Sequence, residues 1–123
     1  MDASFPKNEK LCGKQSVDHL YKEGKRFVSW PLRVIYIVAP DNANRVLIWA
    51  PKSLFRHAVD RNRLRRQMRE AYRLNKSLLD QSASHFHIAF NYVDKNKQDY
   101  HLIEKAMRKA LKKLNQLTYE KVD

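Results

Sequence analysis

The sequence is poor in glycine, cysteine and long apolar runs, and each shortage excludes a class of protein. Its only glycines, Gly13 and Gly24, cannot form the phosphate-binding patterns G-x-x-x-x-G-K-S/T or G-x-G-x-x-G. A single cysteine, Cys12, excludes an internal disulfide and is typical of a reducing compartment. No apolar run approaches the roughly 20 residues of a membrane span, and the N-terminal MDASFPKNEK lacks the apolar core of a signal peptide. We therefore expect a soluble, cytoplasmic protein.

Acidic residues are scarce as well. The 13 Asp and Glu residues stand against 25 Lys and Arg, which gives a formal net charge of +12 and an isoelectric point near 10.0. This excess favours a polyanionic partner, either a nucleic acid or an anionic membrane surface. The few carboxylates are scattered over different predicted elements, so the sequence predicts neither a two-metal nuclease site nor a zinc site. We expect no catalytic side chains and no bound metal in this chain.

The positive charge is concentrated in residues 56–76, RHAVDRNRLRRQMREAYRLNK. This stretch has no glycine or proline and consists mostly of good helix formers, which predicts a helix that starts within residues 54–60 and ends near residue 79. At about 100° per residue, its charged and apolar residues separate onto facing arcs. The charged arc holds Arg61, Asn62, Arg65, Arg66, Arg69, Arg73 and Lys76, and the apolar arc holds Leu64, Met68, Ala71, Tyr72, Leu78 and Leu79.

The charged arc favours nucleic acid over a solvated or membrane-bound surface. Solvated helix faces usually mix signs, because like charges at i,i+4 repel, yet the i,i+4 series from Arg61 to Arg73 is entirely positive. Arginine predominates over lysine, and its planar guanidinium grips phosphate and stacks on bases. A membrane-surface helix would carry Trp, Phe and Leu on its apolar side. The apolar arc here instead has the composition of ordinary core packing.

The rest of the chain predicts two more helices and four strands in one small domain. Apolar periodicity and turn residues delimit a helix from Ser16, its N-cap, to Gly24 at its C-cap, strands at about 26–29, 32–39, 45–50 and 86–93, and a helix at about 100–116. The first three strands predict an antiparallel meander. The fold class is α+β in the order α-β-β-β-α-β-α, with a four-stranded sheet packed with three helices. We expect the domain to span 1–116, with an extended basic lead-in at 1–14 and a flexible tail at 117–123.

Four aromatic residues lie on or near the predicted strands: Phe27, Trp30, Tyr36 and Trp49. Each can pack in the core, or it can offer a stacking platform to a single-stranded nucleic acid. A helix-turn-helix is excluded, because no short turn and partner helix precede the basic helix.

At DRNRLRR, residues 60–66, the sequence resembles the protein subunit of bacterial ribonuclease P. The preceding APKSLFRHAV, residues 50–59, is similar to that family's entry into its basic helix, and residues 7–24 are similar to its first helix. The resemblance covers residues 5–116 and includes the order of the elements.

The resemblance implies a function and a fold. The family pairs with a large catalytic RNA that removes the 5′ leader from precursor tRNA, and this RNA holds the Mg²⁺-dependent chemistry. The resemblance therefore implies that this chain is an enzyme subunit with no organic cofactor. It also implies that the protein is a monomer in a 1:1 complex with the RNA. The implied fold is ribosomal protein S5 domain 2-like, with a left-handed β-α-β crossover against the usual right-handed rule.

The resemblance also implies two sets of site residues. The RNA subunit would be bound by Lys52, Arg56, Arg61, Asn62, Arg63, Arg65, Arg66, Arg69 and Arg73. The single-stranded leader would lie in a cleft between the first helix and the sheet, at Val17, Tyr21 and Tyr36. Arg63 projects about 200° from Arg61, off the charged arc.

Two other functions remain open from the residues alone. One is a structural RNA-binding protein, similar to a ribosomal protein, with no role in an enzyme. The other is a protein-only nuclease, which the missing carboxylate cluster disfavours.

Overall fold

The computed structural model describes residues 9–39, 41, 43–79 and 85–121, with side chains up to residue 117. Its elements are α1 (Lys14–Glu23), β1 (Lys25–Ser29), β2 (Leu32–Ala39), β3 (Arg45–Trp49), α2 (Ala58–Asn75), the 3₁₀ turn η2 (Lys76–Leu78), β4 (His85–Tyr92) and α3 (Tyr100–Lys121). The predicted α+β class and element order are confirmed. Of the predicted lead-in at residues 1–14, residues 1–8 lie outside the described residues, and Lys14 already belongs to α1.

The four strands form one sheet in the order β1-β2-β4-β3. β1 with β2 and β2 with β4 are antiparallel, whereas β3 pairs with β4 in parallel. The predicted meander is therefore wrong for β3, which does not pair with β2. β4 is buried on both faces, at Phe90 and at Ala89, and this double burial favours its place between β2 and β3. The unit β3–α2–β4 is the parallel crossover to which the family's left-handed connection would apply.

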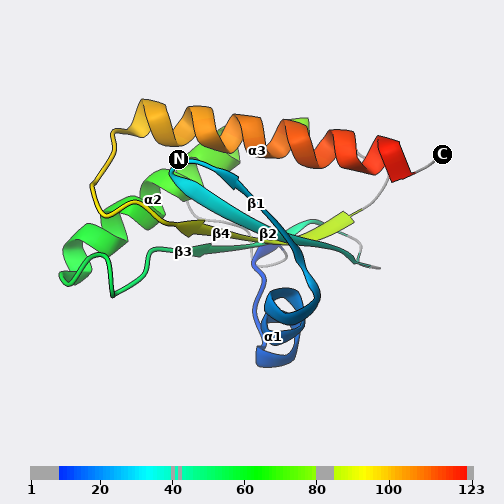
Figure 1. Cartoon of the computed structure of the whole chain (residues 1–123), viewed down its shortest axis with the longest axis horizontal. Coiled ribbons are helices and arrows are strands. Elements are labelled where there is room, and N and C mark those ends of the chain that lie inside the picture. Colours follow the sequence, from blue (N-terminus) through cyan, green and yellow to red (C-terminus); the bar gives the residue numbers. More distant parts are fainter. Residues whose placement is uncertain (1–8, 40, 42, 80–84, 122–123) are drawn as a thin grey trace.

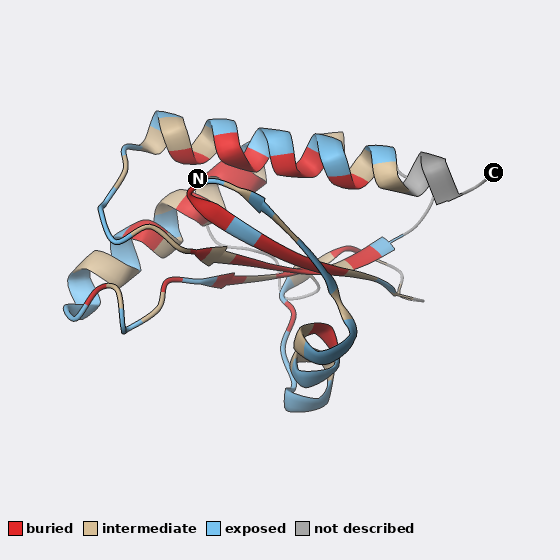
Figure 2. Ribbon diagram, viewed as in Figure 1, coloured by how far each residue is buried: buried red, intermediate tan, exposed pale blue. Residues whose placement is uncertain are grey.

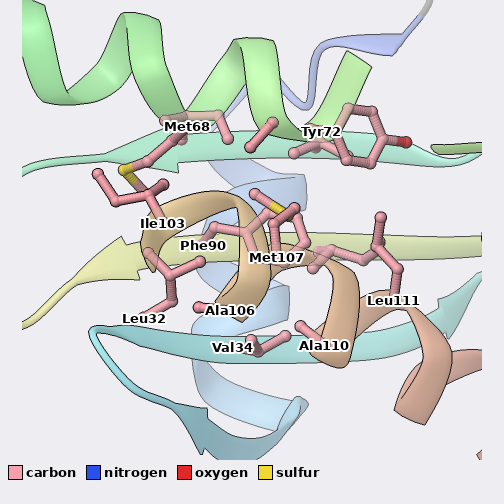
Figure 3. Packing of buried hydrophobic residues seen from close by; sticks show 14 of the residues in the cluster. Leu32, Val34, Met68, Tyr72, Phe90, Ile103, Ala106, Met107, Ala110 and Leu111 are labelled. Carbon is pink, nitrogen blue, oxygen red and sulfur yellow. The ribbon is translucent and has the colours of Figure 1, made fainter. Parts of the chain in front are cut away.

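Helices cover the two faces of the sheet unequally (Figure 1). α2 and α3 pack side by side on one face and enclose the main core (Figure 3), whereas α1 alone lies on the opposite face. Side chains of β2 alternate between the two, so that Val34 and Tyr36 join the main core and Ile35 joins a smaller cluster with Leu20 of α1. The described residues therefore leave part of the α1 side of the sheet exposed, at Arg33 and Trp49.

α2 is the amphipathic helix that the sequence predicts. Leu64, Met68, Ala71 and Tyr72 are buried against the sheet and α3, so the opposite arc faces outward. The last helix extends to Lys121, beyond the predicted end at residue 116, because Leu117 continues the apolar stripe and packs against the main core.

Glycines delimit α1 at both ends. The predicted N-cap at Ser16 is wrong, because the helix starts at Lys14 and Gly13 takes the N-cap position with φ of +93°, a conformation that favours glycine. At the other end, the Gly24 N–H donates to the Leu20 carbonyl at 2.8 Å. A Cβ at Gly24 would lie 2.4 Å from that oxygen, so the close approach of the backbone requires glycine.

Candidate nucleic-acid interface

The outward side of α2 carries a basic surface, which we call the α2 basic face: Arg61, Asn62, Arg65, Arg66, Arg69 and Arg73. Asn62 and Arg66 are exposed, and the others are partly buried at their stems. Within the described residues, no carboxylate lies at ion-pair distance from Arg65, Arg66 or Arg69. Because the apolar side of the helix is fixed in the core, these guanidinium groups are presented on a rigid support.

The arginines of this face do not share one environment. Arg61 Nη1 donates to the carbonyls of Phe55 at 2.7 Å and Arg56 at 3.0 Å, which ties the segment before α2 to the first turn of the helix. Arg73 forms an ion pair with Glu70, with Nη2 and Oε1 2.6 Å apart. Sequence position alone did not distinguish these two arginines from the others.

Arg69 is a partly desolvated member of the face. Burial lowers the pKa of its guanidinium, and the neighbouring charges of Arg65 and Arg66 lower it further. Its side chain borders a small pocket of about 190 Å³ against Cys12 and Ile48. Arginine stays charged at neutral pH, so an anion bound here would relieve the repulsion among the three guanidinium groups.

The remaining predicted RNA-binding residues flank the α2 basic face. Lys52 and Arg56 are exposed in the segment between β3 and α2. Arg63 is exposed on another side of the helix, where it lines a pocket of about 270 Å³ with Lys97 and Gln98. Its separation from the main arc agrees with its angular position in the sequence.

The α1 side of the sheet brings together two of the three predicted leader-binding residues. Val17 and Tyr21 are partly buried and pack against the cluster that contains Ile35 and Ala89. The Tyr21 hydroxyl donates to Asn91 Oδ1 at 3.0 Å, which fixes the orientation of the ring over the sheet.

Tyr36 lies on the opposite face, so the structure does not bring it together with Val17 and Tyr21. Its side chain is 7% exposed and packs edge-on against Phe27 and Phe86, with ring centroids 5.8 and 6.2 Å apart. Burial raises the pKa of its hydroxyl. Neighbouring strand residues point to opposite faces, and therefore Ile35, not Tyr36, faces α1.

A cross-strand row lies beside Tyr21, and of its members the sequence indicated only Trp49, as a possible stacking platform. Arg33 of β2 and Trp49 of β3 both pair with Asn91 of β4, and all three share the face of Ile35 and Leu47. Arg33 is exposed and Trp49 is 47% exposed. The row offers a cation, an amide and an indole next to Tyr21. Only the strand order, which is non-local, could have revealed it.

The described residues contain no cluster of three or more His, Cys, Asp or Glu side chains that could hold a metal ion. His87 Nε2 contacts Asp41 Oδ2 at 2.9 Å, and Arg45 binds the same carboxylate at 2.5 Å.

Cys12 is exposed as a free thiol. Within the described ranges, no helix is both long and apolar enough to cross a membrane.

These features define a small basic α+β protein whose α2 basic face suits a nucleic acid and whose described residues show no metal-ligand cluster. The family model "Ribonuclease P" matches residues 5–115. The chain therefore belongs to the ribonuclease P protein family, the protein subunit of the endoribonuclease holoenzyme that matures the 5′ end of tRNA. The family makes an RNA the partner of this chain, and a purely structural role similar to that of a ribosomal protein is not favoured.

Individual relatives agree with this assignment. The "Ribonuclease P protein component" of Porphyromonas gingivalis is 38% identical over 112 residues, which cover 85% of this chain and 82% of the relative. The ribonuclease P protein of Thermotoga maritima has a similar fold, with a TM-score of 0.72, 23% identity and coverage of 85% and 96%. A Staphylococcus aureus ribonuclease P protein mutant "with defective mRNA degradation activity" gives a TM-score of 0.73 at 20% identity, over 86% of this chain and 87% of the other. These two structures support the fold.

Proposed function

We propose that this chain binds the catalytic RNA of ribonuclease P through the α2 basic face and holds the 5′ leader of precursor tRNA on the α1 side of the sheet. The observation that carries the first part is the set of guanidinium groups at Arg65, Arg66 and Arg69, which have no carboxylate partner among the described residues and stand on a helix anchored in the core. Each can neutralise a phosphate and release its counterions.

The leader part of the proposal rests on the surface around Tyr21. Val17 and Tyr21 form one wall, and the cross-strand row of Arg33, Asn91 and Trp49 continues from it across the sheet. Exposed rings can stack on bases, and Arg33 can contact the backbone of a single strand. This arrangement suits single-stranded RNA better than a duplex, whose bases are already stacked.

In this proposal the protein positions RNA and the RNA subunit performs the cleavage. Mg²⁺ is bound mainly by the RNA subunit, no organic cofactor is needed, and one protein monomer joins one RNA. The direct test is reconstitution of the full chain with a catalytic ribonuclease P RNA at low Mg²⁺, with leader cleavage as the readout. Cleavage should saturate at one protein per RNA and stop on addition of a chelator. Cleavage by the protein without RNA would contradict the proposal.

The α2 basic face is tested by Arg65→Ala/Arg69→Ala. The slope of log K against log salt for binding to the catalytic RNA should become shallower by about 1.4–1.8, because each phosphate contact contributes about 0.7–0.9. The matched control is Arg108→Ala/Lys112→Ala, which removes the same charge from exposed positions on α3. Equal slopes for both variants would mean that only net charge matters.

The leader surface is tested by Tyr21→Ala in the reconstituted holoenzyme. Loss of one stacked base, about 1–3 kcal/mol, should weaken binding of precursor tRNA roughly 5- to 150-fold, while mature tRNA binding stays unchanged. Tyr21→Phe keeps the ring and removes only the hydrogen bond to Asn91, so it should retain most of the affinity. An equal loss for precursor and mature tRNA would place the leader elsewhere.

A further inference from the structure

A groove of about 470 Å³ lies between the edge strand β1 and α3, away from both surfaces described above. One wall is the end of β1 with Phe27, Ser29 and Trp30, and the other is the side of α3 that carries Lys105 and Lys109. We call it the β1–α3 groove. β1 and β3 are opposite edges of the sheet; α3 packs on β1 and β2, whereas α2 packs on β3, so the groove and the α2 basic face are built from different strands and different sides of the helix pair (Figure 1).

The α3 wall carries a row of like charges. Lys105, Lys109 and Lys113 follow one another at i,i+4 spacing, about 6 Å apart along the helix axis. This step is close to the distance between adjacent phosphates along an RNA strand. Among the described residues, no carboxylate lies at ion-pair distance from any of the three. All three lysines are exposed, and exposed positions recur along the whole described length of α3 (Figure 2). Such a row repels itself, so a polyanion bound along it would relieve the repulsion.

The β1 wall adds an aromatic platform. Trp30 is 52% exposed, although it is among the largest apolar side chains of the protein. Lys113 Nζ lies 4.5 Å from the centroid of the Phe27 ring, which places charge and aromatic surface side by side. The Ser29 hydroxyl donates to the Ala106 carbonyl at 2.8 Å and joins the two walls. The platform is therefore held at a fixed position relative to the lysines.

We propose that the β1–α3 groove binds a single-stranded RNA segment, with successive phosphates along Lys105, Lys109 and Lys113 and a base stacked on Trp30. An acidic peptide could satisfy the lysines, but the phosphate-like spacing and the exposed indole favour RNA. The groove and the α2 basic face have no residue in common, so the protein would present two separate contacts to RNA.

The test uses the full chain with Trp49→Phe, which leaves Trp30 as the only tryptophan and therefore as a local reporter. A short single-stranded oligouridylate should quench Trp30 fluorescence in a saturable and salt-dependent manner. Lys105→Ala/Lys109→Ala in this background should weaken the binding that Trp30 reports about tenfold at physiological salt and make the salt slope shallower by about 1.4. Arg108→Ala/Lys112→Ala changes the charge equally outside the groove and should have little effect.

Further variants and a control polyanion distinguish RNA binding in the groove from other causes of quenching. Lys105→Arg/Lys109→Arg keeps the charge and should retain the quenching. The proposal is overturned if Trp30 does not respond while the protein binds RNA, if the two alanine pairs have equal effects, if the arginine pair also loses the signal, or if oligoglutamate quenches Trp30 as strongly as RNA. Titration with the catalytic RNA and with precursor tRNA then identifies which RNA supplies the segment. Because Trp30 reports only the groove, failure of the α2 basic face would leave this signal intact.

Discussion

The ion pair between Glu70 and Arg73 places a negative charge within the α2 basic face. Arg73 donates two hydrogen bonds to the Glu70 carboxylate, from Nε at 3.1 Å and from Nη2 at 2.6 Å. These hydrogen bonds lower the pKa of Glu70, so the carboxylate is ionised at neutral pH. Glu70→Gln removes this charge and releases Arg73 from its strongest competitor for a phosphate.

The expected gain in RNA affinity is that of one additional phosphate contact, made by Arg73. The slope of log K against log salt for the catalytic RNA should steepen by about 0.7–0.9, which corresponds to roughly fivefold tighter binding at physiological salt. The free energy of unfolding should change little. The side chains of Glu70 and Arg73 are 31% and 29% exposed, and ion pairs near the surface contribute about 0–1 kcal/mol. The variant should therefore bind RNA more tightly while it unfolds at nearly the same temperature.

The assay is a salt series of RNA binding by fluorescence anisotropy. The matched control is Glu23→Gln, which makes the same charge change at an exposed site on α1. If Glu23→Gln steepens the slope as much as Glu70→Gln, the gain comes from net charge. If Glu70→Gln leaves the slope unchanged, Arg73 does not contact phosphate and the reasoning is refuted.

Three further predictions concern stability. Gly24→Ala should lower the free energy of unfolding, measured by thermal denaturation, by about 1–3 kcal/mol, because its Cβ would lie 2.4 Å from the Leu20 carbonyl oxygen. An unchanged unfolding temperature would contradict the close approach. Met68→Ala should lower the free energy of unfolding, measured by urea denaturation, by about 2–5 kcal/mol, because it leaves a cavity between α2 and the sheet. Burial raises the pKa of Tyr92 above its ordinary value of 10.0, so the stability linked to its protonated hydroxyl is complete below pH 10 and decreases as pH rises through the folded-state pKa. Tyr92→Phe should remove this alkaline decrease and cost about 1–2 kcal/mol at neutral pH, since it breaks hydrogen bonds with Asn96 and Gln98.

The sequence predicted the elements well because their signals are local. The two arcs of α2 follow from helical periodicity alone, and Leu64 and Met68 are buried as expected. The strand order depends on contacts between distant segments, such as the pairing of Arg45 with His87 in the parallel β3–β4 ladder. No local pattern distinguishes that ladder from a meander.

The site was predictable in charge but not in detail. Tyr36 was placed on the wrong side because β2 is apolar along most of its length, so alternation gives no indication of which residues face α1. The roles of Arg61 and Arg73 depend on the Phe55 carbonyl and on Glu70, and only coordinates reveal such partners. The neighbouring positions of Arg33, Asn91 and Trp49 likewise require the sheet order.

The short segment before α1 pairs with the edge strand β3. The Leu11 N–H donates to the Val46 carbonyl at 3.0 Å, Lys10 forms a parallel bridge with Val46, and Glu9 pairs with Lys76 at 3.0 Å. This segment therefore covers the start of the edge strand β3, which would otherwise present unpaired peptide groups to a strand of another molecule. A chain shortened to begin at Lys14 would expose this edge and should aggregate more readily than the full chain.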